Sequence, residues 1–216
     1  MLVGASSAQD STDETARRVP FRVPVVALPL TPYNLQRGMA DLAWAVHLPI
    51  GYEAPEGGSL QPMPLQPGFM IMTAGRTIEE ILGDVVAREP RYTWTLDDGV
   101  VHLRLATAIS DRGNVLNQEI TEFAVNDVTL QQARRELHDT LHPESRGAVV
   151  ITTGLAPAAL GLRRFSVRTG PTTVLGALDA IVKAHGASSW SLTYDGQGAR
   201  RYRISLHVFD GWSTTW

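Results

Sequence analysis

Two histidines have the spacing that most directly suggests chemistry. His138 and His142 lie four residues apart in RRELHDTLHP, a stretch with helical periodicity, so both imidazoles would face the same side of a helix. Two such rings could bind one metal ion. The sequence provides no third ligand at a fixed spacing, and the helix dipole favours a histidine near the C-terminal end of any helix. We therefore predict no metal site and no cofactor.

Acidic, serine and glycine motifs are explained by structural roles. Glu79 and Glu80 lie in the first turn of a predicted helix, where carboxylates suit the dipole, and Asp97 and Asp98 precede a glycine in a predicted hairpin turn. The serines lack the G-x-S-x-G context of a nucleophile. The stretch GQGARR at 196–201 joins two predicted strands, so it lacks the helix N-terminus that would bind phosphate. We predict no catalytic residues.

Aromatic and loop residues provide the candidate binding surface. Trp94 and Trp190 could line a ligand site, but each begins or lies in a strand that follows a predicted helix, which favours core packing. Two further tryptophans lie in the polar C-terminal segment and would either pack on the body or contact a partner. Residues 52–68, rich in Pro and Gly, predict a long surface loop. The candidate interaction residues are Tyr52, Leu60, Met63, Leu65, Trp212 and Trp216.

The elements that would position these residues are clearest between residues 76 and 105. Thr77 and Glu80 form a capping-box signature at the start of a helix, and Pro90 ends it. The alternation in YTWTL predicts a strand, DDG predicts a tight turn, and VVHLRL predicts a returning strand. The apolar stripe of the helix, which another element must cover, consists of Ile78, Ile81, Leu82, Val85 and Val86.

A similar arrangement returns 96 residues later in the chain. Amphipathic composition alone would repeat the helix stripe, but it would not also repeat the aromatic residues on either side. We therefore predict a tandem duplication of a β-α-β-β-α-β-β module, in the α+β class, with the helices packed on small mixed sheets. The pairs that share the offset include Phe69 and Phe165, Thr77 and Thr173, Leu82 and Leu178, and Trp94 and Trp190.

The predicted division of the chain follows from this repeat. Residues 20–106 form the first module, 107–116 the connection, 117–210 the second module and 211–216 a C-terminal tail. Residues 1–19 are either a disordered arm or the remnant of a signal peptide, because Ser6 and Ala8 match the −3 and −1 positions of a signal-peptidase site. We expect a truncated signal peptide and an exported protein, periplasmic or secreted.

Composition narrows the classes of function. The 216 residues carry 19 basic and 22 acidic side chains, a formal charge of −3, which argues against binding nucleic acid through its phosphates. No apolar run reaches the roughly 18 residues of a membrane-spanning helix. The chain has 0 cysteines, so it forms no disulfides and has no thiolate chemistry.

Two stretches of the first module resemble a known family. NLQRGMADLAWAVHLPIGYEA and FMIMTAGRTIEEILGDVVAREPRYTWTLDDGVVHLR are similar to the secretin and TonB short N-terminal domain, a small periplasmic module. The resemblance covers the first module and, in the second, residues 165–206. It implies a domain that binds other proteins, without catalytic residues, and a partner in the cell envelope or outer membrane.

Three classes of function remain for this sequence. The leading hypothesis is a non-catalytic module for protein–protein contact, using edge strands or the 52–68 loop. The alternative is binding of a small molecule or carbohydrate in a groove between the two modules. An enzyme ranks last, because no nucleophile–base pair or set of three metal ligands stands out. The sequence does not indicate the oligomeric state.

Overall fold

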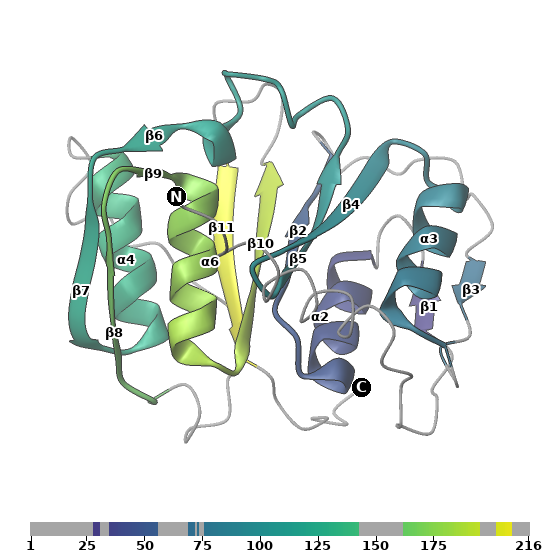
Figure 1. The fold of residues 1–216 in the computed structure, drawn as a ribbon, viewed down its shortest axis with the longest axis horizontal. Helices are drawn as coiled ribbons and strands as arrows, with labels where there is room; N and C mark the ends of the chain where they lie inside the picture. The colour runs from purple at the N-terminus through teal and green to yellow at the C-terminus, as the bar shows by residue number, and fades with distance from the viewer. Residues whose placement is uncertain are drawn as a thin grey trace, which may run out of the picture.

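A five-stranded mixed sheet joins the two halves of the chain (Figure 1). The computed structural model describes residues 28–30, 35–55, 69–71, 73, 76–142, 162–194 and 202–208. Neighbouring strands of the sheet run antiparallel in its two outer pairs and parallel in its two inner pairs. In spatial order the strands are β11 (Tyr202–Val208), β10 (Ser188–Tyr194), β2 (Ile50–Glu53), β5 (Val100–Leu105) and β4 (Tyr92–Asp97).

Helices cover both faces of this sheet. In Figure 1, α2 (Leu35–Val46) and α3 (Ile78–Arg88) lie on one side, and α4 (Leu130–Leu141) and α6 (Val174–His185) lie on the other. Successive residues of a strand point to opposite faces. Accordingly Val101 of β5 packs in the core beneath α2 and α3, whereas Val100 packs in the core beneath α4 and α6. The sheet therefore separates two apolar cores.

Three two-stranded sheets complete the described fold. The strands β1 (Leu28–Leu30) and β3 (Phe69–Ile71) pair antiparallel, as do β7 (Phe123–Val128) and β8 (Phe165–Thr169). The third pair is β6 (Glu119–Ile120) with β9 (Thr172–Thr173), and β6 comes directly after the short helix η1 (Val115–Asn117) in the chain.

None of the helices described in the structure has the length and apolar character needed to cross a membrane.

Local signals explain where the elements of the first half begin and turn. The Thr77 hydroxyl accepts the Glu80 N–H, and the Glu80 carboxylate accepts the Thr77 N–H, so the predicted capping box of α3 is confirmed. Asp98 and Gly99 have φ angles of 46° and 79°. Two successive left-handed residues form the tight turn that suits the twist of a two-residue hairpin. The predicted β4–β5 hairpin is thus confirmed.

The predicted α+β class is confirmed, and the two halves share part of their topology. The first half runs β1-α2-β2-β3-α3-β4-β5, in the predicted order, and the described part of the second runs β7-α4-β8-β9-α6-β10-β11. Residues 143–161, between α4 and β8, lie outside the described residues. The sequence did not indicate that the halves share a sheet, through the parallel pairing of β10 with β2. Duplication itself stays a prediction.

Candidate functional site

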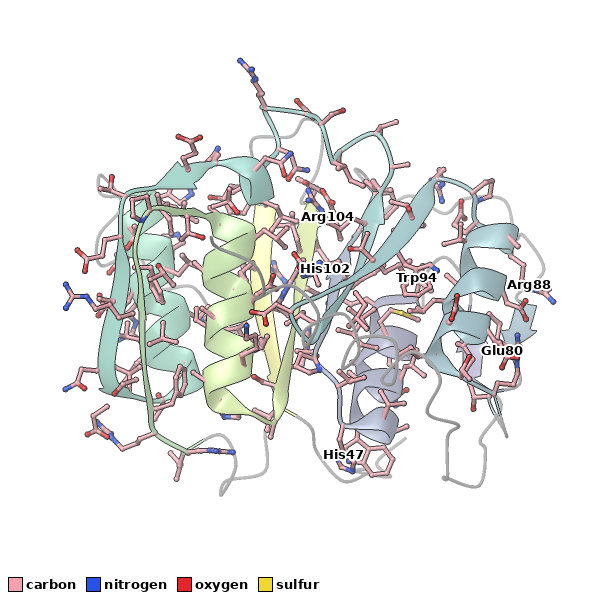
Figure 2. All side chains as sticks on the ribbon, viewed as in Figure 1. His47, Glu80, Arg88, Trp94, His102 and Arg104 are labelled. Carbon is pink, nitrogen blue, oxygen red and sulfur yellow. The ribbon has the colours of Figure 1, made fainter. Side chains whose placement is uncertain are left out.

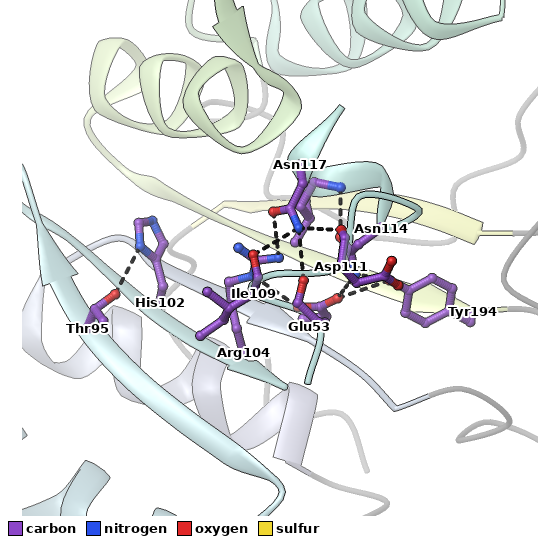
Figure 3. Close-up of polar contacts among 11 residues, drawn as sticks. Glu53, Thr95, His102, Arg104, Ile109, Asp111, Asn114, Asn117 and Tyr194 are labelled. Atoms are coloured by element: carbon purple, nitrogen blue, oxygen red, sulfur yellow. Dashed lines mark hydrogen bonds and ion pairs between the residues drawn. The ribbon is translucent and has the colours of Figure 1, made fainter. Parts of the chain in front are cut away.

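A buried polar cluster lies where the two halves meet (Figure 3). Glu53, on β2, is 0% exposed, and its Oε2 accepts a hydrogen bond of 3.0 Å from Nε of Arg104 on β5. A buried ion pair is stable only when further hydrogen bonds satisfy the remaining polar groups. The other carboxylate oxygen of Glu53 has two such partners, from segments distant in the sequence.

These partners come from the connecting segment and from the second half. Oε1 of Glu53 accepts the hydroxyl proton of Tyr194, on β10, at 3.0 Å, and also accepts from Nδ2 of Asn114. Arg104 donates from Nη2 to Oδ1 of Asn117 at 3.2 Å, and Nδ2 of Asn117 donates to three carbonyl oxygens of residues 108–111. The cluster therefore fixes the connecting segment against both halves.

A second cluster joins β4, β5 and α6. Nε2 of His102 lies 2.9 Å from Oδ2 of Asp179, and Nδ1 lies 3.5 Å from the hydroxyl of Thr95. Asp179 also accepts a hydrogen bond of 3.0 Å from the indole Nε1 of Trp190. His102 is 4% exposed, while Thr95 lies on the exposed part of β4. The carboxylate of α6 thus holds one side chain from each half of the chain.

Gly51 makes room for the indole in this cluster. The register of the sheet places Trp190 beside Gly51, Gly51 beside His102, and His102 beside Thr95. A Cβ built on Gly51 would lie 2.1 Å from Cζ2 of Trp190, which is less than any real contact allows. The missing side chain therefore lets the indole extend across β2 toward His102 and Asp179.

The order hydroxyl, imidazole, carboxylate in this second cluster is also the order of a nucleophile, a base and an orienting acid. A nucleophile and its base usually lie within about 2.6–3.2 Å of each other, and often farther apart before substrate binds. Here Thr95 and His102 are 3.5 Å apart, and Asp179 is shared with the indole. In the structure these contacts link β4, β5, β10 and α6.

The structure places the predicted site residues as follows. Tyr52, expected on an interaction surface, is 2% exposed, so that expectation is corrected. Its ring stacks on Tyr92 with centroids 5.8 Å apart, the two hydroxyls lie 2.9 Å apart, and burial raises the pKa of Tyr52 to about 12. The remaining candidates, Leu60, Met63, Leu65, Trp212 and Trp216, lie outside the described residues.

The structure also shows the surroundings of the two histidines considered as metal ligands and of the two tryptophans expected in the core. The rings of His138 and His142 are 5.1 Å apart, but Nε2 of His142 lies 2.6 Å from the hydroxyl of Tyr202. Among the residues that the structure describes, no group of three side chains is arranged to bind a metal ion. Trp190 is buried in the second core and Trp94 packs partly buried against the first, which confirms their predicted packing role.

The β4 edge is one end of the central sheet in the described part of the chain, and β11 forms the other end. We use this name for the side of Tyr92–Asp97 that faces away from β5. In the described part of the chain, β4 pairs only with β5. The N–H of Ala106 bonds to the carbonyl of Arg91, and the N–H of Val101 bonds to the carbonyl of Pro49. The main-chain groups of even-numbered residues of β5 therefore point toward β4, and those of odd-numbered residues point toward β2. By this alternation, the main-chain groups of Trp94 and Leu96 point outward.

Comparison of the chain with protein-family models, with curated proteins and with solved structures found no match. The resemblance to the secretin and TonB short N-terminal domain therefore stays a prediction. The functional argument rests on the geometry of the described residues.

Proposed function

We propose that this protein is a non-catalytic protein-binding module and that the β4 edge is its contact surface. The observation that carries the proposal is the position of β4 at the end of the central sheet, where β5 is its one neighbour among the described strands. A strand at the edge of a sheet can bind an extended segment by main-chain hydrogen bonds, and its side chains set the specificity. Thr95 and Asp97 are exposed on this strand.

The described surface favours this mode of binding over an apolar interface. Among the described residues, only Ile109 and Leu162 are large hydrophobic side chains classed as exposed, at 44% and 67%. Two separate side chains do not make the contiguous patch that marks a hydrophobic contact site. A partner docking on the described surface would therefore use polar side chains or a strand edge, and the edge supplies directional main-chain groups.

Two features of the sequence support an exported location for the protein and its proposed partner. The candidate signal-peptidase site before Gln9 and the resemblance of residues 69–104 to the secretin and TonB short N-terminal domain support an exported protein with a cell-envelope partner. The alternative, a small-molecule site in a groove between the modules, has less support. At the centre of the seam β2 and β10 are paired strands of one sheet, so no groove separates these two strands.

Site-specific photo-crosslinking in cells that naturally make the protein tests this proposal. A photoreactive amino acid replaces Thr95 on β4 in the full chain, and the control places it at Gln131, which is exposed on α4. We expect a discrete protein adduct from position 95 and no such adduct from position 131. Equal adducts from both positions, or no protein adduct from position 95, would contradict the proposal.

A further inference from the structure

We propose that residues 148–153 bind along the outer side of β11 as a further strand of the central sheet, parallel to β11. These residues, AVVITT, lie outside the described part of the chain. The inference goes beyond the proposed function, because it concerns the end of the sheet opposite the β4 edge. It rests on an equivalence between the two halves, which predicts the place and the direction of this strand.

The last hairpins of the two halves, β4–β5 and β10–β11, are equivalent. Trp94 pairs with Leu103 in the first hairpin, and Trp190 pairs with Leu206 in the second. Trp94 packs on the core of α2 and α3, whereas Trp190 packs in the core of α4 and α6. Figure 2 shows Trp94 on the α3 side of the sheet and His102, which bonds to α6, on the other side. Each tryptophan thus faces helices of its own half, and β11 corresponds to β5.

A half-turn relates these two hairpins. Along the sheet β11 precedes β10 just as β5 precedes β4, so the order within each hairpin is the same. The directions are opposite, because β10, β2 and β5 run parallel to one another and β11 runs antiparallel to β10. The helices of the two halves also lie on opposite faces (Figure 1). A half-turn about an axis that crosses the strands within the sheet produces all three observations.

This half-turn predicts the outer neighbour of β11. In the first half, β2 lies beside β5 on the side away from β4 and runs parallel to β5. The equivalent strand of the second half therefore lies beside β11 on the side away from β10, and it runs parallel to β11. In the chain β2 lies between α2 and β3, so its equivalent belongs between α4 and β8, within residues 143–161.

The packing of the helices agrees with this position. In the first half α3 packs on β4, and in the second half α6 packs on β10, so these two helices are equivalent. Their partners α2 and α4 are then equivalent as well. Helix α2 packs on β2, whereas α4 packs on β11, the outermost described strand of its half. A strand beside β11 would lie next to α4 as β2 lies next to α2.

The burial of β11 fits an edge that gains from a further neighbour. Val101 and Leu103 of β5, which lies between β2 and β4, are 0% exposed. Their equivalents on β11, Ile204 and Leu206, pack against the second core but are only half-buried. Removing apolar surface from water is favourable. A strand along the outer side of β11 would therefore bring these side chains closer to the burial of their equivalents.

The composition of the segment suits this place. Residues 148–153 form an apolar and β-branched run, and Gly147 and Gly154 bound it. Valine, isoleucine and threonine favour strands, and glycines mark the ends of strands. Strands that pair in parallel and are covered by helices have continuous apolar runs rather than strict alternation. Within residues 143–161 this run is the stretch that best matches a strand.

Amide exchange followed by NMR in the full chain tests whether β11 is covered. The N–H of Ala54 bonds to the carbonyl of Leu192, so even-numbered residues of β10 direct their main-chain groups to β2 and odd-numbered ones to β11. By the antiparallel register, the N–H of Ser205 faces β10 and those of Ile204 and Leu206 face away from it. We expect Ile204 and Leu206 to exchange as slowly as Ser205. Fast exchange at these two positions would overturn the inference.

A pair of charges identifies the segment that covers β11. Val150→Asp/Ile151→Asp places one carboxylate toward the second core in any register, because successive residues of a strand point to opposite faces. We expect the two outward amides of β11 to exchange at least about tenfold faster in this variant, while the amides of β5 keep their rates. The control Ala158→Asp/Ala159→Asp adds the same charge outside the proposed strand and should behave as the wild type does. Equal rates in the two variants would contradict the assignment.

Disulfide formation shows whether the strand comes from the same chain. The chain has 0 cysteines, and neighbouring strands lie about 4.8 Å apart, within the reach of a disulfide. Ser205→Cys is combined in turn with a cysteine at each position from 149 to 152. We expect alternate positions to form a disulfide within one monomer, and Thr95→Cys, which replaces Ser205→Cys as the control, to form none. Covalent dimers in place of the internal disulfide, or no disulfide at any position, would overturn the inference.

Discussion

The indole of Trp190 lies over Gly51, from the other half of the chain, and occupies the space where a side chain on Gly51 would be. This contact joins β10 to β2 at the centre of the sheet. We expect Gly51→Ala to reduce the free energy of unfolding by about 1–3 kcal/mol, because overpacked cores must shift side chains and backbone. Urea denaturation monitored by tryptophan fluorescence measures the change.

The matched control for Gly51 is Gly83, in the interior of α3. A Cβ on Gly83 would meet nothing within 4 Å. Alanine there should stabilise the protein by about 0.5–1 kcal/mol, because it restricts the unfolded chain more than glycine does. If Gly51→Ala were as stable as Gly83→Ala, the proposed fit of Trp190 over Gly51 would be wrong.

The buried ion pair between Glu53 and Arg104 should contribute strongly to the join between the halves. We expect Glu53→Gln to cost about 3–5 kcal/mol of unfolding free energy, because it leaves the buried guanidinium without its counter-charge. The control is Glu122→Gln, which breaks an exposed pair with Arg168 and should cost at most about 1 kcal/mol. Chemical denaturation of both variants checks this, and similar losses would contradict the assigned role of Glu53.

Helix capping provides a prediction within each half. Thr77 and Thr129 each accept a main-chain N–H at the start of a helix, within a capping box. Replacing either by alanine should cost about 1 kcal/mol, and a Thr77→Ser control should retain most of the stability. The two costs should add in the double variant, because the sites share no partner. A strongly non-additive result would show that α3 and α4 are coupled through the sheet.

A partly buried hydrogen-bond chain predicts a pH dependence. Gln36 donates to the Ser191 hydroxyl at 2.8 Å, and that hydroxyl lies 2.8 Å from Nε2 of His207. Burial lowers the pKa of His207 below its usual 6.5. The unfolded chain therefore binds this proton at a higher pH than the folded chain does. Unfolding free energy should fall as the pH drops below about 6.5.

The variant His207→Gln isolates this contribution. Because it removes the titrating group, its unfolding free energy should fall less steeply than that of the wild type between about pH 6.5 and pH 5. Thermal or urea denaturation across this range measures the two slopes. Parallel curves for wild type and variant would show that His207 does not control the acid sensitivity.

Short-range features of the fold could be predicted from the sequence because their signals are local. The helix at Thr77 and the turn at Asp98 and Gly99 depend on residues within a few positions of each other. Tyr52 was misassigned because it precedes a Pro- and Gly-rich stretch. It belongs instead to β2, an inner strand buried on both faces, so its position next to a loop did not indicate exposure.

The polar clusters could not be predicted because their partners are far apart in the chain. Glu53 is separated in the sequence from Arg104 by 51 positions and from Tyr194 by 141 positions. One signal was available: His102 and Arg104 alternate with aliphatic residues in VVHLRL, and β5 is buried along nearly its whole length. Buried charged groups in a strand require partners. The sequence contains that requirement without identifying Glu53 or Asp179 as the partners.

The central claim, that the β4 edge is open to a partner, is tested most directly by amide hydrogen exchange in dilute protein, followed residue by residue by NMR. The N–H groups of Thr93 and Thr95 face β5 and should exchange slowly, whereas that of Leu96 faces outward and should exchange much faster. Equal protection of all three amides in the dilute protein would show that the edge is already covered and would contradict the account.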